Sequence, residues 1–163
     1  MEFRLRDYQD RDFEVLWAID QQCFAPGIAY SRRELSIYIR RRGAFTIIAE
    51  SEAADGVKGS GVAGFIVAEA NRRGVGHIIS IDVLPTNRRF GLGSTLLASA
   101  EARLKTANCH TVVLETAVDN TGALSFYKRR GYDILKTSPR YYSNGIDAFV
   151  LGKRLASLQH SAD

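Results

Sequence analysis

A turn with two glycines separates an apolar stretch from a helical stretch near the middle of the chain. The apolar stretch HIISIDVL covers residues 77–84, and the turn PTNRRFGLGS covers residues 85–94. From residue 92 to residue 104, leucine or alanine recurs at every fourth position, which is the spacing of a helix face. Such a turn directs free backbone amides and the positive end of the helix dipole to one point. The order strand, glycine turn, helix therefore predicts an anion-binding turn in an α/β fold.

Three known anion-binding turns can be compared with this one. A P-loop needs a lysine between glycine and Ser/Thr, but here Gly93 is followed directly by Ser94. A dinucleotide-binding turn needs its first glycine directly after the strand and a small sixth residue, which here is Leu96. The pattern Arg-x-x-Gly-x-Gly is met by Arg88, Gly91 and Gly93. It predicts a pyrophosphate site, although the pattern taken alone also fits a plain surface loop.

The composition bounds the class of protein. The 163 residues are 45% hydrophobic and 25% charged, as in a soluble globular protein. We expect a single domain over residues 1–155 and a frayed tail over residues 156–163. The first residues do not resemble a secretory signal, and no run of about 18 apolar residues occurs. A cytoplasmic protein outside the membrane is therefore expected.

Charge and metal-ligating residues exclude further classes. The net charge of +4 is compatible with an anionic ligand. No pattern of aromatic and basic residues indicates a nucleic-acid-binding module, so no nucleic-acid partner is expected. Two cysteines, Cys23 and Cys109, and three histidines, His77, His110 and His160, are scattered along the chain. This distribution predicts neither a metal site nor a disulfide framework.

Periodicity and capping signals predict the remaining elements. Ser31 and Glu34 are spaced as a capping box, Asn120 is a good helix N-cap, and Gly131 is a good helix terminator. A polar hairpin is expected at residues 52–60. The expected strands are residues 3–8, 44–51, 61–69, 75–84, 111–116, 132–138 and 147–155, and the expected helices are residues 11–23, 31–42, 92–104 and 121–130. The order β-α-α-β-β-β-α-β-α-β-β predicts an α/β fold with a mixed, mostly antiparallel central sheet and flanking helices.

Two separated motifs give the chain a specific resemblance. With HIISIDVLPTNRRFGLGSTLL at residues 77–97 and LETAVDNTGALSFYKRRGY at residues 114–132, the sequence resembles the GNAT superfamily of N-acetyltransferases. The resemblance extends from about Arg4 to Leu155. Within the superfamily it is most similar to the protein N-terminal acetyltransferases, including the RimI branch, because RYYSNGIDAFVL follows at residues 140–151. The resemblance implies the GNAT fold, with acetyl-CoA as cosubstrate and no metal.

The resemblance also implies which residues bind the cosubstrate. The strand residues Ile81, Asp82 and Val83 would receive the pantetheine arm and the acetyl carbonyl. Asn120 would contact the pantetheine arm in addition to capping its helix. The residues of the turn that would hold the pyrophosphate are Arg88, Arg89, Phe90, Gly91, Leu92, Gly93 and Ser94.

Acetyl transfer to an amine needs a neutral amine and a proton for the departing sulfur. The resemblance assigns the general base to Glu115, at the end of a predicted strand, and the general acid to Tyr127. A phenol with a pKa of about 10 keeps its proton at neutral pH and can donate it. The alternatives are a solvated charge at Glu115 and a packed core ring at Tyr127.

The acceptor is the least determined part of the sequence. By resemblance, the acceptor site is formed by Phe24, Tyr30, Tyr141 and Tyr142. Two adjacent strand tyrosines would point to opposite faces unless a loop twists them. Residues 24–30 are longer than the short turn of RimI-like proteins. A protein N-terminal α-amine, for example that of a ribosomal protein, is the expected acceptor. A small amine such as a polyamine, amino acid or antibiotic is the alternative, and a non-catalytic acyl-CoA-binding module is a third. A monomer and a homodimer are both compatible with the sequence.

Overall fold

The computed structural model describes residues 2–51 and 60–156. Apart from Ser60, the expected polar hairpin at residues 52–60 lies outside the described residues. The tail expected to fray at residues 156–163 also lies outside them, apart from Ala156.

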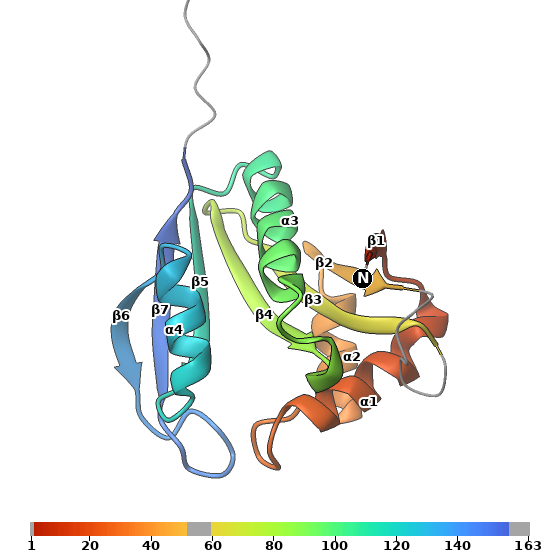
Figure 1. The fold of residues 1–163 in the computed structure, drawn as a ribbon. Coiled ribbons are helices and arrows are strands. Elements are labelled where there is room, and N and C mark those ends of the chain that lie inside the picture. The colour runs from red at the N-terminus through yellow and green to blue at the C-terminus, as the bar shows by residue number, and fades with distance from the viewer. Residues whose placement is uncertain (1, 52–59, 157–163) are drawn as a thin grey trace, which may run out of the picture.

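A seven-stranded sheet forms the centre of the fold, with strand order β1-β2-β3-β4-β5-β7-β6 (Figure 1). Neighbouring strands run antiparallel except β4 and β5, which run parallel. This arrangement confirms the expected mixed, mostly antiparallel sheet. The strands are β1 Arg4–Asp7, β2 Ala44–Glu50, β3 Val62–Ala70, β4 Val75–Val83, β5 Thr111–Ala117, β6 Asp133–Ser138 and β7 Ala148–Arg154.

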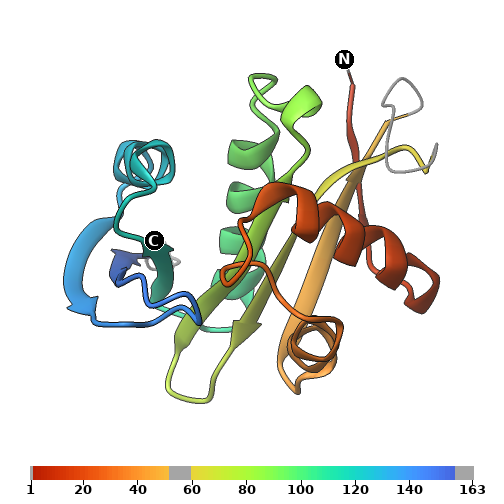
Figure 2. The same ribbon diagram turned by 90° about the horizontal axis from the view of Figure 1, so that it is seen from below.

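Helices cover both faces of the sheet (Figures 1 and 2). On one face, α1 and α2 pack against a core that includes Phe65 and Val67 of β3. On the other face, α3 and α4 pack against a core that includes Ile66 and Ala68 of the same strand. The alternation of side chains along β3 thus supplies both cores. The helices are α1 Phe13–Cys23, α2 Arg32–Arg40, α3 Leu92–Thr106 and α4 Thr121–Arg129, with 3-10 turns η1 Asp10–Asp12 and η3 Pro85–Asn87.

The predicted helix ends are confirmed by their hydrogen bonds. The Ser31 hydroxyl accepts from the Glu34 amide at 3.1 Å, and the Glu34 carboxylate accepts from the Ser31 amide at 3.1 Å. The Asn120 side chain accepts from the Ala123 amide at 3.1 Å. Gly131 follows α4 with φ +91°, a conformation that glycine adopts without strain.

The parallel strands β4 and β5 diverge soon after they meet. They pair at Val75, Gly76 and His77 only, opposite residues 111–113 of β5. Gly76 lets Leu104 of α3 approach closely, since a Cβ at Gly76 would lie 2.7 Å from the Leu104 side chain. Beyond His77 the two strands separate, and the sheet opens between them (Figure 1).

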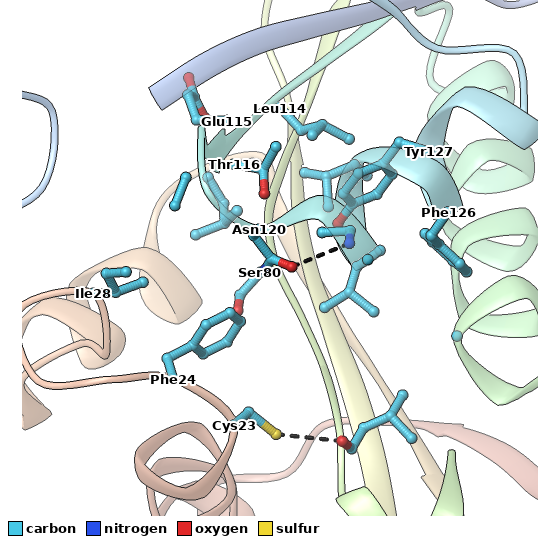
Figure 3. Close-up of a pocket in the computed structure, with 18 of the residues that line it drawn as sticks. Cys23, Phe24, Ile28, Ser80, Leu114, Glu115, Thr116, Asn120, Phe126 and Tyr127 are labelled. Atoms are coloured by element: carbon cyan, nitrogen blue, oxygen red, sulfur yellow. Dashed lines mark hydrogen bonds between the residues drawn. The ribbon is translucent and has the colours of Figure 1, made fainter. Parts of the chain in front are cut away.

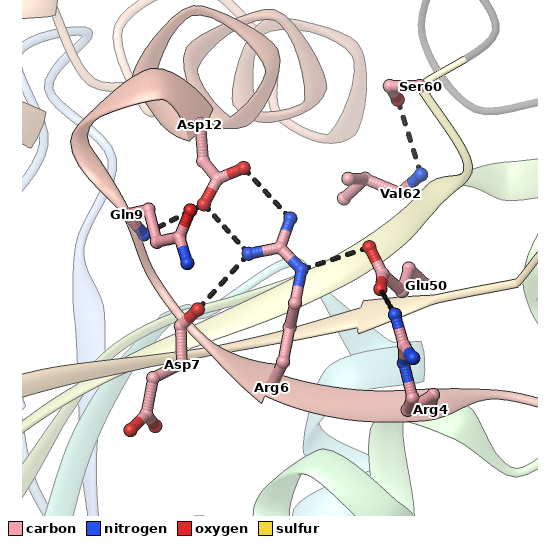
Figure 4. A network of polar contacts seen from close by, with 8 residues as sticks. All are labelled: Arg4, Arg6, Asp7, Gln9, Asp12, Glu50, Ser60 and Val62. Atoms are coloured by element: carbon pink, nitrogen blue, oxygen red, sulfur yellow. Dashed lines mark hydrogen bonds and ion pairs between the residues drawn. The ribbon is translucent and has the colours of Figure 1, made fainter.

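An ion-pair network ties the first helix to the edge of the sheet (Figure 4). The Arg6 guanidinium donates to both carboxylate oxygens of Asp12 at 2.9 Å and to Glu50 at 2.9 Å. Asp12 also accepts from the Gln9 amide at 2.8 Å. The hydrogen bond from Arg6 lowers the pKa of Asp12 below its ordinary value, against the opposing effect of burial. Asp12 is therefore a buried carboxylate that stays charged.

We predict that Asp12→Asn destabilises the fold by about 2 kcal/mol at neutral pH, because the partly buried Arg6 loses its hydrogen bonds to a charged group and keeps only Glu50 as an ionic partner. The native pKa of Asp12 is lowered, so its contribution is present above the unfolded pKa of about 3.9 and is lost as pH falls through the native value. Urea unfolding should show the wild-type advantage near pH 7 and its loss in acid. An advantage that persists unchanged in acid would contradict the ionic origin.

Candidate active site

A cleft of about 920 Å³ opens where β4 and β5 diverge (Figure 3). Its walls come from both strands, from the start of α3, from α4, and from the loops before α2 and before β7. Most of the predicted site residues line it: Phe24, Tyr30, Ile81, Val83, Arg88, Arg89, Gly91, Leu92, Gly93, Ser94, Glu115, Asn120, Tyr127, Tyr141 and Tyr142. The divergence of two strands thus gathers residues that are far apart in the sequence.

Two predicted cosubstrate-binding residues lie elsewhere. Phe90 is 53% exposed, does not line the cleft, and its ring centroid lies 6.3 Å from that of Phe3. Asp82 is completely buried and its nearest polar partners are Ser80 and Asp20. The prediction for these two residues therefore finds no support in the placement of their side chains.

The glycine turn has a conformation that requires glycine at its centre. Gly91 is the N-cap of α3 with φ +73°, and a Cβ there would meet no atom within 4 Å. The requirement at Gly91 is thus one of backbone conformation and not of space. Arg88 donates to the Val83 carbonyl at 2.9 Å, which holds the turn against the end of β4. The residues that open α3, Leu92, Gly93 and Ser94, line the cleft. The first amides of a helix lack partners within it and are available to an anion.

Glu115 is paired with His77, one of the three histidines that are scattered along the sequence. Its Oε2 lies 2.6 Å from Nε2 of His77, and Nδ1 of His77 lies 3.7 Å from Glu69. Glu69 in turn lies 3.3 Å from Arg41. Because His77 pairs with Val113 in the parallel ladder, it stands beside the strand segment that carries Glu115. The pairing of His77 with Glu115 can be predicted only when the order of the strands is known, because the two residues lie on neighbouring strands.

The two acidic neighbours raise the pKa of His77. Burial by itself would lower this pKa, but the hydrogen bond with Glu115 and the charges of Glu115 and Glu69 outweigh burial. His77 does not line the cleft, whereas Glu115 does. The pair therefore presents a carboxylate to the cleft with an imidazole behind it. Such an arrangement can accept a proton and hold it between two groups.

Tyr127 lines the cleft from α4 and also packs against other rings (Figure 3). Its ring centroid lies 5.2 Å from that of Phe126 and 5.7 Å from that of Tyr132, in edge-on geometry. Burial, followed by the nearby charges of Asp82 and Tyr142, raises the pKa of Tyr127. The phenol therefore keeps its proton at neutral pH and is available as a donor.

The paired tyrosines lie in a loop between β6 and β7 and not on a strand. The opposite orientation expected for adjacent strand tyrosines therefore does not arise, because a loop carries both residues and both line the cleft. Their ring centroids are 4.9 Å apart at 86°, and both rings line the cleft. In the same loop, the Ser143 hydroxyl donates to the Gly27 carbonyl at 2.9 Å. The two loops that hold the predicted acceptor residues thus touch each other.

Tyr30 is fixed at both ends in the longer loop of residues 24–30. Its amide donates to Asp20 at 2.7 Å, and its hydroxyl donates to the Ile79 carbonyl of β4 at 3.1 Å. Its carbonyl accepts from Trp17 at 3.2 Å and from Gln21 at 2.8 Å. The additional residues of this loop are therefore anchored to α1 and to β4.

Residues 2–51 and 60–156 contain neither a candidate metal cluster nor a candidate membrane-spanning helix. Within these ranges no cluster of three or more His, Cys, Asp or Glu side chains could hold a metal ion. No helix within them has both the length and the apolar character that crossing a membrane requires.

Sequence comparison finds relatives that align with about half of the chain. An N-alpha-acetyltransferase of Sulfurisphaera tokodaii is 40% identical over 81 residues, which are 49% of this chain and 48% of that protein. Human N-alpha-acetyltransferase 30 is 38% identical over 76 residues, 47% of this chain and 21% of that protein. For the first of these relatives, the chain therefore spans about half of the length.

Structural comparison finds similar folds over nearly the whole chain. Ard1 from Thermoplasma volcanium superposes with a TM-score of 0.83 at 24% identity, covering 96% of this chain and 100% of that one. A chain of the NatC complex bound to Gag peptide and CoA gives a TM-score of 0.79 at 26% identity, with coverage of 96% and 100%.

One family model matches residues 5–132, which include the glycine turn, Glu115 and Tyr127. The matched region is the larger part of the chain and contains the diverging strands β4 and β5. By this match, the chain belongs to the acetyltransferase (GNAT) family.

Proposed function

We propose that this protein transfers an acetyl group from acetyl-CoA to a protein N-terminal α-amine. The observation that carries the proposal is the content of one cleft. An anion-binding turn, a carboxylate–imidazole pair and a protonated phenol line or adjoin the gap between β4 and β5. These are the groups that direct acyl transfer from a thioester to an amine requires.

The residues at one end of the cleft fit the cosubstrate. Gly91 gives the left-handed turn, and Arg88 and Arg89 add positive charge. A Cβ added at Gly93 would lie 3.5 Å from the Phe126 ring. This end would hold the pyrophosphate, and the exposed edge of β4 at Ile81 and Val83 would hold the pantetheine arm. When bound, acetyl-CoA supplies an activated acetyl group.

The Glu115–His77 pair would remove the ammonium proton of the acceptor. An α-amine with a pKa of about 8 is roughly one-tenth neutral at pH 7, whereas a lysine amine at about 10.4 is far less so. Glu115 faces the cleft, directly or through water, and His77 holds its carboxylate at 2.6 Å. An α-amine therefore needs less help from a base than a lysine amine does, which favours the α-amine as acceptor.

Tyr127 would return a proton to the sulfur that leaves. Tyr127 lines this cleft from α4, and its raised pKa keeps the hydroxyl protonated at neutral pH. The hydroxyl would donate a hydrogen bond, and then its proton, to the sulfur as the bond from sulfur to the acetyl carbon breaks.

The acceptor end supports a chain terminus over an internal side chain. The loops at residues 24–30 and 139–147 meet at Gly27 and Ser143, and aromatic rings line the cleft between them. The aligned relatives are named N-alpha-acetyltransferases. A ribosomal protein as acceptor is the narrower form of the proposal, and a small amine is the alternative acceptor.

A screen of CoA release tests the acceptor class. The acceptors are peptides with a free N-terminus, lysine peptides with a blocked N-terminus, and small amines. Free N-termini should give the highest kcat/KM. Turnover confined to small amines would remove the protein acceptor and keep the acetyltransferase, whereas no turnover with any amine would favour a binding module.

We predict that Gly91→Glu abolishes acetyl-CoA binding, because it places a negative charge and a side chain in the pyrophosphate site. Gly91→Ala is the matched control, since it brings the same strain at φ +73° without the charge. Calorimetry should show a much larger loss for glutamate than for alanine. Unchanged affinity in a folded glutamate variant would remove the turn from the cosubstrate site.

Tyr127→Phe keeps the ring and removes only the hydroxyl. We expect kcat to fall by about 10²- to 10⁴-fold with little change in acetyl-CoA affinity, because general acid catalysis is lost. Tyr132→Phe is the control, since Tyr132 is buried beside Tyr127 but donates to Glu101 at 3.0 Å, outside the cleft. Wild-type turnover of Tyr127→Phe would make Tyr127 a packing residue.

Glu115→Gln should lose activity at neutral pH and regain part of it in alkali. Raising the pH from about 7 to 9 supplies neutral α-amine without a base, so the deficit against wild type should shrink. Tyr127→Phe should show no such recovery, because alkali does not protonate sulfur. Glu69→Gln serves as control, as Glu69 contacts His77 but does not line the cleft. A deficit of Glu115→Gln that is constant with pH would assign Glu115 to substrate positioning.

A further inference from the structure

Two carboxylates that the proposed chemistry does not use lie in contact inside the protein. Asp20 of α1 and Asp82 of β4 are both 0% exposed, and their side chains lie within hydrogen-bonding reach of each other. Asp20 Oδ2 accepts from the Tyr30 amide at 2.7 Å, and Asp82 Oδ1 accepts from the Ser80 hydroxyl. The remaining oxygens, Asp20 Oδ1 and Asp82 Oδ2, are buried and find no hydrogen-bond donor among the described residues.

A proton between the two carboxylates accounts for both unpartnered oxygens. Two buried carboxylates without a cation between them repel each other, whereas one proton converts the repulsion into a hydrogen bond. The charged or titratable groups that act on the pair from the surrounding elements do not replace that proton. They are Arg88 from the turn before α3, Glu34 from α2, Cys23 from α1, Tyr30 from the loop and Tyr127 from α4.

The pair joins the two halves of the cleft. Asp20 holds the amide of Tyr30, a residue of the acceptor wall whose hydroxyl donates to Ile79 of β4. Asp82 precedes Val83, whose carbonyl accepts from Arg88 of the glycine turn at 2.9 Å. A hydrogen bond between Asp20 and Asp82 thus connects the acceptor wall to the strand beside the cosubstrate.

We propose that Asp20 and Asp82 share one proton and act as a positioning pair that fastens the acceptor wall, residues 24–30, to β4. The effect on catalysis rests on the proposed function. The shared proton itself does not, because it is a property of the folded protein without substrates.

The shared proton gives stability a definite dependence on pH. Burial raises the pKa of Asp82 and of Asp20 above the unfolded value of about 3.9; the contact between them raises the pKa of Asp82 further and lowers that of Asp20, without cancelling the effect of burial. Stability from this proton is complete below the unfolded pKa and is lost as pH rises toward the folded value. Within that window the unfolding equilibrium constant should rise about tenfold per pH unit, which corresponds to one proton released on unfolding.

The first experiment measures this slope without any substrate. Denaturant unfolding is followed between about pH 5 and 7, above the unfolded pKa of an aspartate, for the wild type, Asp82→Asn and Asp20→Asn. An asparagine amide can donate to the remaining carboxylate in place of the proton. Both variants should fold. In each, the unfolding equilibrium constant should lack the tenfold rise per pH unit that the shared proton gives the wild type. Asp12→Asn is the matched control, because Asp12 is a buried carboxylate that Arg6 keeps charged. The unfolding equilibrium constant of this variant should depend on pH as steeply as that of the wild type.

The shared proton would be overturned if the unfolding equilibrium constants of both asparagine variants depended on pH as steeply as that of the wild type. A large gain in stability at pH 7 with no change in slope would also overturn it, since that result means two charges in contact. Neither outcome depends on turnover. The proposed function can therefore fail while the shared proton stands, and the reverse.

The second experiment tests positioning through rescue by the conservative variant. Asp20→Ala removes the acceptor for the Tyr30 amide and should raise the KM of the acceptor peptide about tenfold, the effect of one lost hydrogen bond to a charged group. The KM of acetyl-CoA should change less. Asp20→Asn keeps an oxygen that accepts from the Tyr30 amide and an amide group that donates to Asp82, so it should restore the acceptor KM to the wild-type value. Equal changes in both KM values for alanine, or no rescue by asparagine, would reject the positioning role.

Discussion

The separation of β4 from β5 is the constraint on which the rest of the structure depends. Two parallel strands that pair at three positions and then diverge leave an edge of β4 without a neighbour inside the sheet. An exposed strand edge offers unpaired backbone groups, which need either another strand or a ligand. The helices α3 and α4, and the loops at residues 24–30 and 139–147, line the resulting gap, and so a packed sheet contains a cleft.

Three arrangements of buried or partly buried carboxylates have different electrostatic consequences. Asp12 faces a guanidinium and stays charged, which fixes the first helix to the sheet. Glu115 faces an imidazole with a raised pKa, so a proton can move within the pair. Asp82 is in contact with another carboxylate and with a hydroxyl, and a shared proton satisfies it. The same functional group thus anchors, exchanges a proton or holds one, according to its neighbour.

Interactions that are local in sequence were predicted well from the residues. The capping box at Ser31, the caps at Asn120 and Gly131, and the buried face of α3 depend on spacings of a few residues. The glycine turn was recognised for the same reason. The sequence left the orientation of Tyr141 and Tyr142 open, because their loop contacts Gly27, over a hundred residues away in the sequence.

The sequence by itself determined the order of elements, the glycine turn at the start of α3 and its resemblance to an acetyltransferase, because these are written in local periodicity and motif spacing. Only the tertiary structure decided that His77 stands behind Glu115, that Asp82 is turned to Asp20 and away from the cleft, and that Phe90 is exposed. Each of these depends on which strand or helix lies beside another. Pairing between strands is set by the packing of the whole chain, and no single stretch of sequence encodes it.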